Sequence, residues 1–102
     1  DAYAEVPDWA RAPGLDPRAE MVRLVADLSA YARQTKPGFL VFVQNAPELA
    51  EEPAYLQAVD GIGQEETWVA ATNRVLPAAE TAWTEGWLSA FRKAGKLVLT
   101  VD

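Results

Sequence analysis

The sequence predicts an α/β fold in which parallel strands alternate with helices. The first observation is the order of patterns along the chain, which runs loop, helix, strand, helix, strand, helix, strand. The second is the wholly or mainly apolar character of segments 39–43 and 97–101, which is typical of strands in a parallel sheet covered on both faces. Because parallel strands need a crossover between them, this alternation indicates right-handed βαβ units.

The amino-acid composition limits the kinds of catalytic and binding groups that this chain can use. The 102 residues suit one small domain, and a net charge of −6 without a Lys/Arg cluster argues against a nucleic-acid partner. The absence of cysteine and histidine excludes a disulfide framework, a thiolate nucleophile, a Ser-His-Asp triad and a Cys/His metal site. No apolar run is long enough to span a membrane. We therefore expect any chemistry of this chain to be carried out by carboxylates, amides, hydroxyls or lysine, without a cofactor or a metal. Oligomeric state stays open.

The first helix is expected to begin at Asp16-Pro17, with Asp16 as the N-cap and Pro17 at the first helical position. It is expected to end by Lys36-Pro37-Gly38, because proline and glycine do not continue a helix. Five apolar residues at helical spacing predict the face that packs on the rest of the domain: Met21, Leu24, Val25, Leu28 and Ala32.

A short helix is expected over 53–59, followed by a weak strand over 60–63. That strand contains Gly61 and Gly63, and glycine inside a strand often marks a close approach of a ligand or of other backbone. A long helix is expected over 77–94, where Trp83 and Trp87 are interpreted as packing between helix and sheet.

Polar side chains follow each predicted strand. Because the carboxyl ends of parallel strands meet at one edge of a sheet, we expect these side chains to gather on one rim, where ligands of such folds bind. Each residue could also serve only as a cap or a solvated surface group. The six residues are Gln44, Asn45, Gln64, Glu65, Glu66 and Asp102.

Several spaced motifs together resemble the endo-alpha-1,4-polygalactosaminidase-like glycoside hydrolases (family 114). The motifs are Tyr31-Ala32-Arg33, Pro37-Gly38-Phe39, Gln44-Asn45, Glu48-Leu49, Tyr55-Leu56 and Val59-Asp60-Gly61-Ile62-Gly63 with Glu65 after it. The resemblance covers nearly the whole chain. It implies that residues 1–102 are a partial (β/α)8 TIM-barrel domain, truncated at both ends and running from about helix 4 to strand 7.

The resemblance also implies roles for individual residues. Glu65 aligns with the glutamate taken as the general acid, which would protonate a leaving glycosidic oxygen. Four further residues would contribute to substrate binding or support, and the tail of the family's strand-four motif, Asp1-Ala2-Tyr3, adds Asp1. The four are Gln44, Asn45, Trp68 and Asp102. The implied substrate is an amino-sugar polysaccharide, and the implied location is extracytoplasmic.

The sequence departs from the family pattern in three places. Ala46 replaces a glycine, the residues after Trp68 lack the usual Tyr-Gly, and the partner aspartate would fall three positions before Asp1. Glycoside hydrolysis uses two carboxylates, about 5 Å or about 6.5–9.5 Å apart. The chain alone is therefore expected to be inactive.

Two other functions stay open on the sequence. One is a barrel that binds carbohydrate without cleaving it. The other is a sugar-phosphate isomerase, which is disfavoured because no glycine-rich phosphate loop precedes a helix. We further expect Glu66 to be solvated or salt-bridged, and Asp60 to lie at the start of its strand with a stabilising role.

Overall fold

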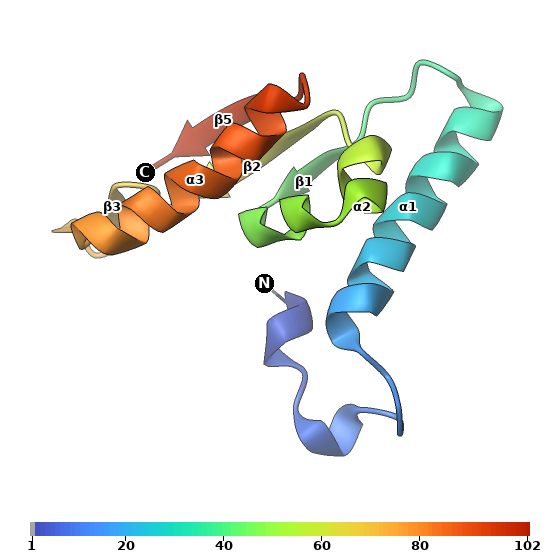
Figure 1. Ribbon diagram of the computed structural model, residues 1–102, viewed down its shortest axis with the longest axis horizontal. Helices are drawn as coiled ribbons and strands as arrows, with labels where there is room; N and C mark the ends of the chain where they lie inside the picture. Colours follow the sequence, from blue (N-terminus) through green and yellow to red (C-terminus); the bar gives the residue numbers. More distant parts are fainter. Residues whose placement is uncertain (1) are drawn as a thin grey trace.

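The computed structural model describes residues 2–102 and shows a mixed α/β architecture built on one parallel three-stranded sheet (Figure 1). Its strands are β1 (Phe42–Gln44), β2 (Gly61–Glu65) and β5 (Leu97–Val101), paired in the order β1-β2-β5. Both pairings are parallel. The predicted α/β class with parallel strands is therefore confirmed.

The first strand is shorter than predicted. Strand β1 begins at Phe42, whereas the sequence predicted a strand from Phe39. The amide of Phe39 donates to the carbonyl of Lys36 at 2.9 Å, so the segment before β1 is held in a turn. Phe39 and Leu40 are exposed, and their apolar character does not reflect burial in the described structure.

Register determines which side chains share a face of the sheet. Phe42 pairs with Gly61, Gly61 pairs with Leu97, and Glu65 pairs with Val101. Paired residues project their side chains to the same face of the sheet. Along each strand, successive side chains point to opposite faces. The first face therefore carries eight residues: Phe42, Gln44, Gly61, Gly63, Glu65, Leu97, Leu99 and Val101.

The helices cover only the opposite face of the sheet. Figure 1 shows α2 (Pro53–Ala58) and α3 (Ala78–Lys93) on one side of the strands, and the turn η3 (Pro47–Glu51) packs against α3. The largest fully buried hydrophobic side chains of this core are Leu49, Val59, Ile62 and Phe91.

The first face is open, which corrects the prediction of a sheet covered on both sides. Phe42, Leu97, Leu99 and Val101 are 47%, 52%, 52% and 66% exposed. The total accessible surface is 6733 Å², against about 5,700 Å² for a compact monomer of this mass. Within residues 2–102, no element covers the apolar side chains of this face well enough to bury them.

The helix α1 (Pro17–Thr35) begins as predicted, because the Asp16 side chain accepts a hydrogen bond from the amide of Arg18 at 3.0 Å. Its buried face was predicted only in part. Met21, Val22, Val25, Ala26 and Ser29 lie on the packed side, and the Ser29 hydroxyl donates to the carbonyl of Ala58 at 2.6 Å. Leu24 and Leu28 are more than half exposed, so the face that meets α2 is rotated from the predicted one.

Asp60 holds the amino ends of the strands together, as expected for a stabilising residue at the start of a strand. Its Oδ2 accepts hydrogen bonds from the amide of Val41 at 2.7 Å and from Arg33 Nη2 at 2.9 Å. Its carbonyl accepts the amide of Leu97 at 3.0 Å. One aspartate thus connects β1, β5 and α1, at the end of the sheet opposite to Glu65.

The remaining elements lie outside the sheet and its helices. Two short 3-10 turns, η1 (Ala2–Glu5) and η2 (Asp8–Ala10), precede α1. An antiparallel hairpin of β3 (Val69–Ala70) and β4 (Arg74–Val75) interrupts the connection between β2 and α3, and the sequence did not predict it.

Candidate functional site

Two predicted site residues, Asn45 and Glu65, are joined by a pair of hydrogen bonds at the carboxyl ends of β1 and β2. Asn45 Nδ2 donates to Glu65 Oε2 at 3.1 Å, and the Glu65 amide donates to Asn45 Oδ1 at 2.9 Å. The second bond fixes which end of the Asn45 amide group is the oxygen. The Asn45 side chain therefore both anchors the end of β2 and orients the Glu65 carboxylate.

Left-handed backbone at the strand ends makes this arrangement possible. Asn45 and Ala46 have φ values of 58° and 51°, and Glu66 has a φ of 52°. Asparagine adopts the left-handed region readily, whereas this conformation costs about 1–2 kcal/mol at an alanine. The strain at Ala46 explains why a glycine suits that position in the resembling family, and such strain commonly clusters at functional sites.

A polar depression of about 390 Å³ adjoins the pair, lined by Asn45, Gln64, Glu65 and Glu66. Gln44 is exposed at the end of β1 and pairs with Gly63, so it lies on the same sheet face as Glu65. Gly63 has open space where a side chain would be, since the nearest atom to an added Cβ is 4.0 Å away. The rim next to Glu65 is thus sterically accessible to a ligand.

Asp102 binds the loop that follows Glu65. Its Oδ1 accepts the amide of Thr67 at 2.7 Å, and its Oδ2 accepts the amide of Trp68 at 3.1 Å. Both carboxylate oxygens are engaged with backbone in this way, which fits a supporting role better than direct contact with a ligand.

Trp68, which is predicted to contribute to substrate binding, directs its indole toward α3. Its indole Nε1 donates to Glu85 Oε1 on α3 at 2.9 Å. It lines a separate depression together with Val98 and Thr100, which project from the helix-covered face of β5. The contribution of Trp68 to substrate binding stays a prediction. Asp1, the remaining predicted binding residue, lies outside the described residues.

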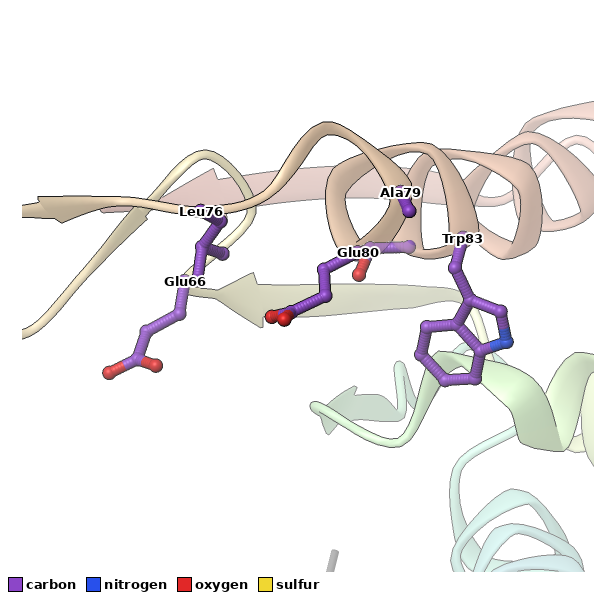
Figure 2. Close-up of a pocket in the computed structure, with 6 residues that line it drawn as sticks. Glu66, Leu76, Ala79, Glu80 and Trp83 are labelled. Carbon is purple, nitrogen blue, oxygen red and sulfur yellow. The ribbon is translucent and has the colours of Figure 1, made fainter.

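Glu66 is exposed, in line with the expectation of a solvated residue, and its side chain also bonds to backbone. Its Oε1 accepts the amide of Ala71 at 3.0 Å, which fastens the β3–β4 hairpin to the end of β2. Glu66 also lines a second depression, of about 460 Å³, together with Glu80 and Trp83. Figure 2 shows both carboxylates and the indole extending to the same side of the ribbon.

Trp83 differs from its interpretation as a packing residue. It is 54% exposed, and its ring meets Trp87 edge to face, with centroids 6.4 Å apart and an interplanar angle of 76°. Trp87 packs on the core, as predicted. The sequence could not separate the two, because both lie four residues apart on one helix.

A cluster of Tyr3, Arg18 and Glu48 joins the N-terminal part of the chain to η3, and the sequence did not predict it. The Tyr3 hydroxyl donates to Glu48 Oε1, and Arg18 Nη2 donates to the carbonyl of Glu48 at 3.2 Å. Burial, followed by the hydrogen bond to Glu48, raises the pKa of Tyr3 to about 12. Burial and the negative charge of Glu48 raise the pKa of Tyr55 to about 12.

Among residues 2–102, no group of three or more His, Cys, Asp or Glu side chains is placed to hold a metal ion. No helix in this described part of the chain has the length and apolar character needed to cross a membrane.

No known protein-family profile matches the chain. Over 85 residues, which is 83% of this chain, it is 41% identical to an uncharacterized protein of Deinococcus radiodurans. The aligned part is 28% of that protein, so the chain spans less than a third of its relative's length.

Proposed function

We propose that this chain is part of a (β/α)8 glycoside hydrolase of the endo-alpha-1,4-polygalactosaminidase type, with Glu65 as its general acid. The observation that carries the proposal is the Asn45–Glu65 pair, which holds a carboxylate at the carboxyl edge of a parallel sheet beside a depression. Ligands of parallel α/β folds bind at this edge, and glycosidases act through carboxylates. The proposed substrate is an amino-sugar polysaccharide outside the cytoplasm.

The exposed apolar surfaces support the barrel part of the proposal. In a barrel, one sheet face forms the interior and the other is covered by helices. Here the helices cover one face, whereas Phe42, Leu97 and Leu99 on the other face are about half exposed. Leu24 and Leu28 on α1 are likewise exposed, as expected for a helix that meets a further helix on that side.

The hydrogen bond from Asn45 favours one oxygen of Glu65 as the proton carrier of the proposed mechanism. Glu65 Oε2 accepts from the Asn45 amide, which favours Oε1 as the oxygen that carries the proton in the proposed mechanism. A general acid in this arrangement would deliver its proton from Oε1 to the glycosidic oxygen while Asn45 holds the other oxygen in place. The second carboxylate that glycosidases need is assigned to the remainder of the parent protein.

The test is cleavage of an α-1,4-linked galactosamine polymer by the full-length protein and by its Glu65→Gln variant. We expect the variant to lose at least about a hundredfold in kcat, because general acid catalysis contributes roughly 10²–10⁴-fold. Glu20→Gln is the matched control, since Glu20 lies on α1 and only pairs with Arg23 on the surface. Cleavage by Glu65→Gln at the rate of the control would remove Glu65 from the mechanism.

A barrel that binds the same polymer without cleaving it is the second candidate. It is favoured by the number of polar groups other than carboxylates at the rim, where Gln44, Asn45 and Gln64 accompany Glu65. Binding without any release of reducing ends by the wild-type protein would support this candidate over the hydrolase.

A further inference from the structure

The turn η3 follows directly on Asn45 and starts from a strained residue. Ala46 caps η3 with φ 51° and ψ 52°, and its carbonyl accepts the amide of Leu49 at 3.2 Å. An alanine stays in this left-handed region only where the surrounding structure overdetermines its backbone. The contacts that hold η3 in place therefore also bear on the backbone next to Asn45.

Arg18, on the first turn of α1, makes three polar contacts with η3 and its C-cap. Its Nη2 donates to the carbonyl of Glu48 at 3.2 Å and to Glu51 Oε2 at 2.9 Å. Its Nε donates to Glu52 Oε1 at 3.5 Å. The donors of a guanidinium lie in one rigid plane, so several bonds from one arginine fix the orientation of η3 relative to α1.

Tyr3 holds the side chain of Glu48, whose carbonyl Arg18 already binds. The Tyr3 hydroxyl donates to Glu48 Oε1, and the Tyr3 ring packs against the core. Burial, followed by this hydrogen bond, raises the pKa of Tyr3 to about 12, so the hydroxyl keeps its proton and remains a donor at neutral pH. Two elements that precede β1 thus hold the same residue of η3.

The apolar side chains of η3 give it a packed side as well. Pro47, Leu49 and Ala50 are buried, and the turn contacts α3. Hydrophobic burial keeps η3 on the core but has no direction of its own. The hydrogen bonds from Tyr3 and Arg18 supply the directional constraint.

The chain between β1 and η3 passes through two consecutive left-handed residues, Asn45 and Ala46. The amide of Asn45 donates to the carbonyl of Gly63 at 2.9 Å, so the sheet holds one side of Asn45. The other side is the peptide group between Asn45 and Ala46, which keeps its orientation only while η3 keeps its place. The Asn45 side chain that results from this turn binds both the carboxylate and the amide of Glu65.

We propose that Tyr3 and Arg18 are positioning residues, which act on Glu65 through η3 and Asn45. By holding η3, this pair imposes the left-handed turn that presents the Asn45 side chain to Glu65. The coupling of the pair to Glu65 is independent of the reaction, whereas its effect on catalysis rests on the proposed function.

Hydrogen exchange of single amides, followed by NMR in the full-length protein, measures the coupling. The Glu65 amide reports on the Asn45 side chain, and the Leu97 amide reports on the opposite edge of the sheet, where it binds the Asp60 carbonyl. Arg18→Gln and Tyr3→Phe should each speed exchange of the Glu65 amide about 3- to 10-fold. Exchange of the Leu97 amide should stay within about twofold, because the sheet itself is intact.

A rescue variant and two matched controls separate positioning from general loss of stability. Ala46→Gly removes the cost of the left-handed region, so adding it to Arg18→Gln should return exchange of the Glu65 amide to within about twofold of wild type. Arg23→Gln removes an arginine of α1 that pairs with Glu20 on the surface. Tyr31→Phe removes the hydroxyl of a tyrosine that is 74% exposed. Both controls should leave the two reporter amides unchanged.

The catalytic consequence is measured on the galactosamine polymer. Arg18→Gln should lower kcat about 3- to 10-fold with a smaller change in KM, because the substrate still binds but the carboxylate is less well oriented. In a protein that already carries Asn45→Ala, the same change should lower kcat by less than about twofold, since the residue that transmits the effect is absent.

The positioning role would be overturned if the Glu65 amide exchanged at the same rate in Arg18→Gln and Tyr3→Phe as in the controls. An equal rise at Glu65 and Leu97 would also overturn it, because the sheet as a whole would then be opening. A full loss of kcat from Arg18→Gln on top of Asn45→Ala would contradict the route through Asn45. Undiminished cleavage by Glu65→Gln would instead refute the hydrolase, and the exchange rates would still decide the coupling.

Discussion

Gly61 and Gly63 lie two residues apart on the same face of β2, yet the structure predicts opposite responses to alanine. A Cβ added at Gly61 would lie 2.4 Å from Phe42 Cε1 and 2.7 Å from the carbonyl oxygen of Leu97. The Phe42 ring can turn aside, but the Leu97 carbonyl belongs to the neighbouring strand and cannot. Gly61→Ala therefore requires β2 and β5 to move apart.

The cost of Gly61→Ala follows from two opposing terms. Overpacking of this kind costs about 1–3 kcal/mol, and replacing glycine by alanine within a strand returns about 0.5–1 kcal/mol. We expect a net loss of about 1–2 kcal/mol in the free energy of unfolding. At Gly63 only the favourable term remains, because the nearest atom to an added Cβ is 4.0 Å away, so Gly63→Ala should be neutral or stabilising.

Equilibrium urea unfolding followed by circular dichroism measures both changes. A further variant, Gly61→Ala with Phe42→Leu, should recover only part of the loss, since the contact with the Leu97 carbonyl remains. The reasoning would be refuted if Gly61→Ala were as stable as Gly63→Ala. Full recovery in the double variant would show that the ring of Phe42, and not the strand spacing, limits residue 61.

Three further predictions concern ionisation and positioning. The hydrogen bond from the Val41 amide, followed by Arg33, holds the pKa of Asp60 below its usual value, so its stabilisation is present above about pH 4 and is lost as pH falls through the lowered pKa. The difference in urea midpoint between wild type and Asp60→Asn should therefore shrink below about pH 4. Tyr55 has a raised pKa of about 12, so its neutral form stabilises the fold up to about pH 10, and stability should fall between about pH 10 and 12 in wild type but less in Tyr55→Phe. Asn45→Ala should lower kcat about 10- to 100-fold with a smaller change in KM, measured on the galactosamine polymer, and an unchanged kcat would contradict its role in orienting the carboxylate.

Much of the secondary structure could be predicted because its signals are local. The Asp16 cap and Pro17 define the start of α1, and Leu97–Val101 forms β5 over the predicted residues. The hairpin of β3 and β4 carries no such signal, because Val69–Ala70 and Arg74–Val75 are too short for a periodic pattern. Its position depends on Glu66, whose side chain binds the amide of Ala71.

The candidate site was predictable as a set of strand ends but not as a set of contacts. Parallel pairing brings Asn45 and Glu65 to one edge, and this follows from the alternation of helices and strands. The sequence could not show that Trp68 turns toward α3 and binds Glu85, or that Trp83 is exposed. Loop backbone decides where those rings point, and the left-handed φ of Glu66 is a property of the folded loop.

The sequence by itself determined the order of elements, the strand ends that carry polar groups and the glycines of β2, since each depends on residues close in the chain. Only the tertiary structure decided which faces are covered. Leu24 and Phe42 are as apolar as Val22 and Ile62, yet the first two are exposed and the last two face partners. Hydrophobic burial has no direction of its own, so the geometry of packing selects which apolar surface is removed from water.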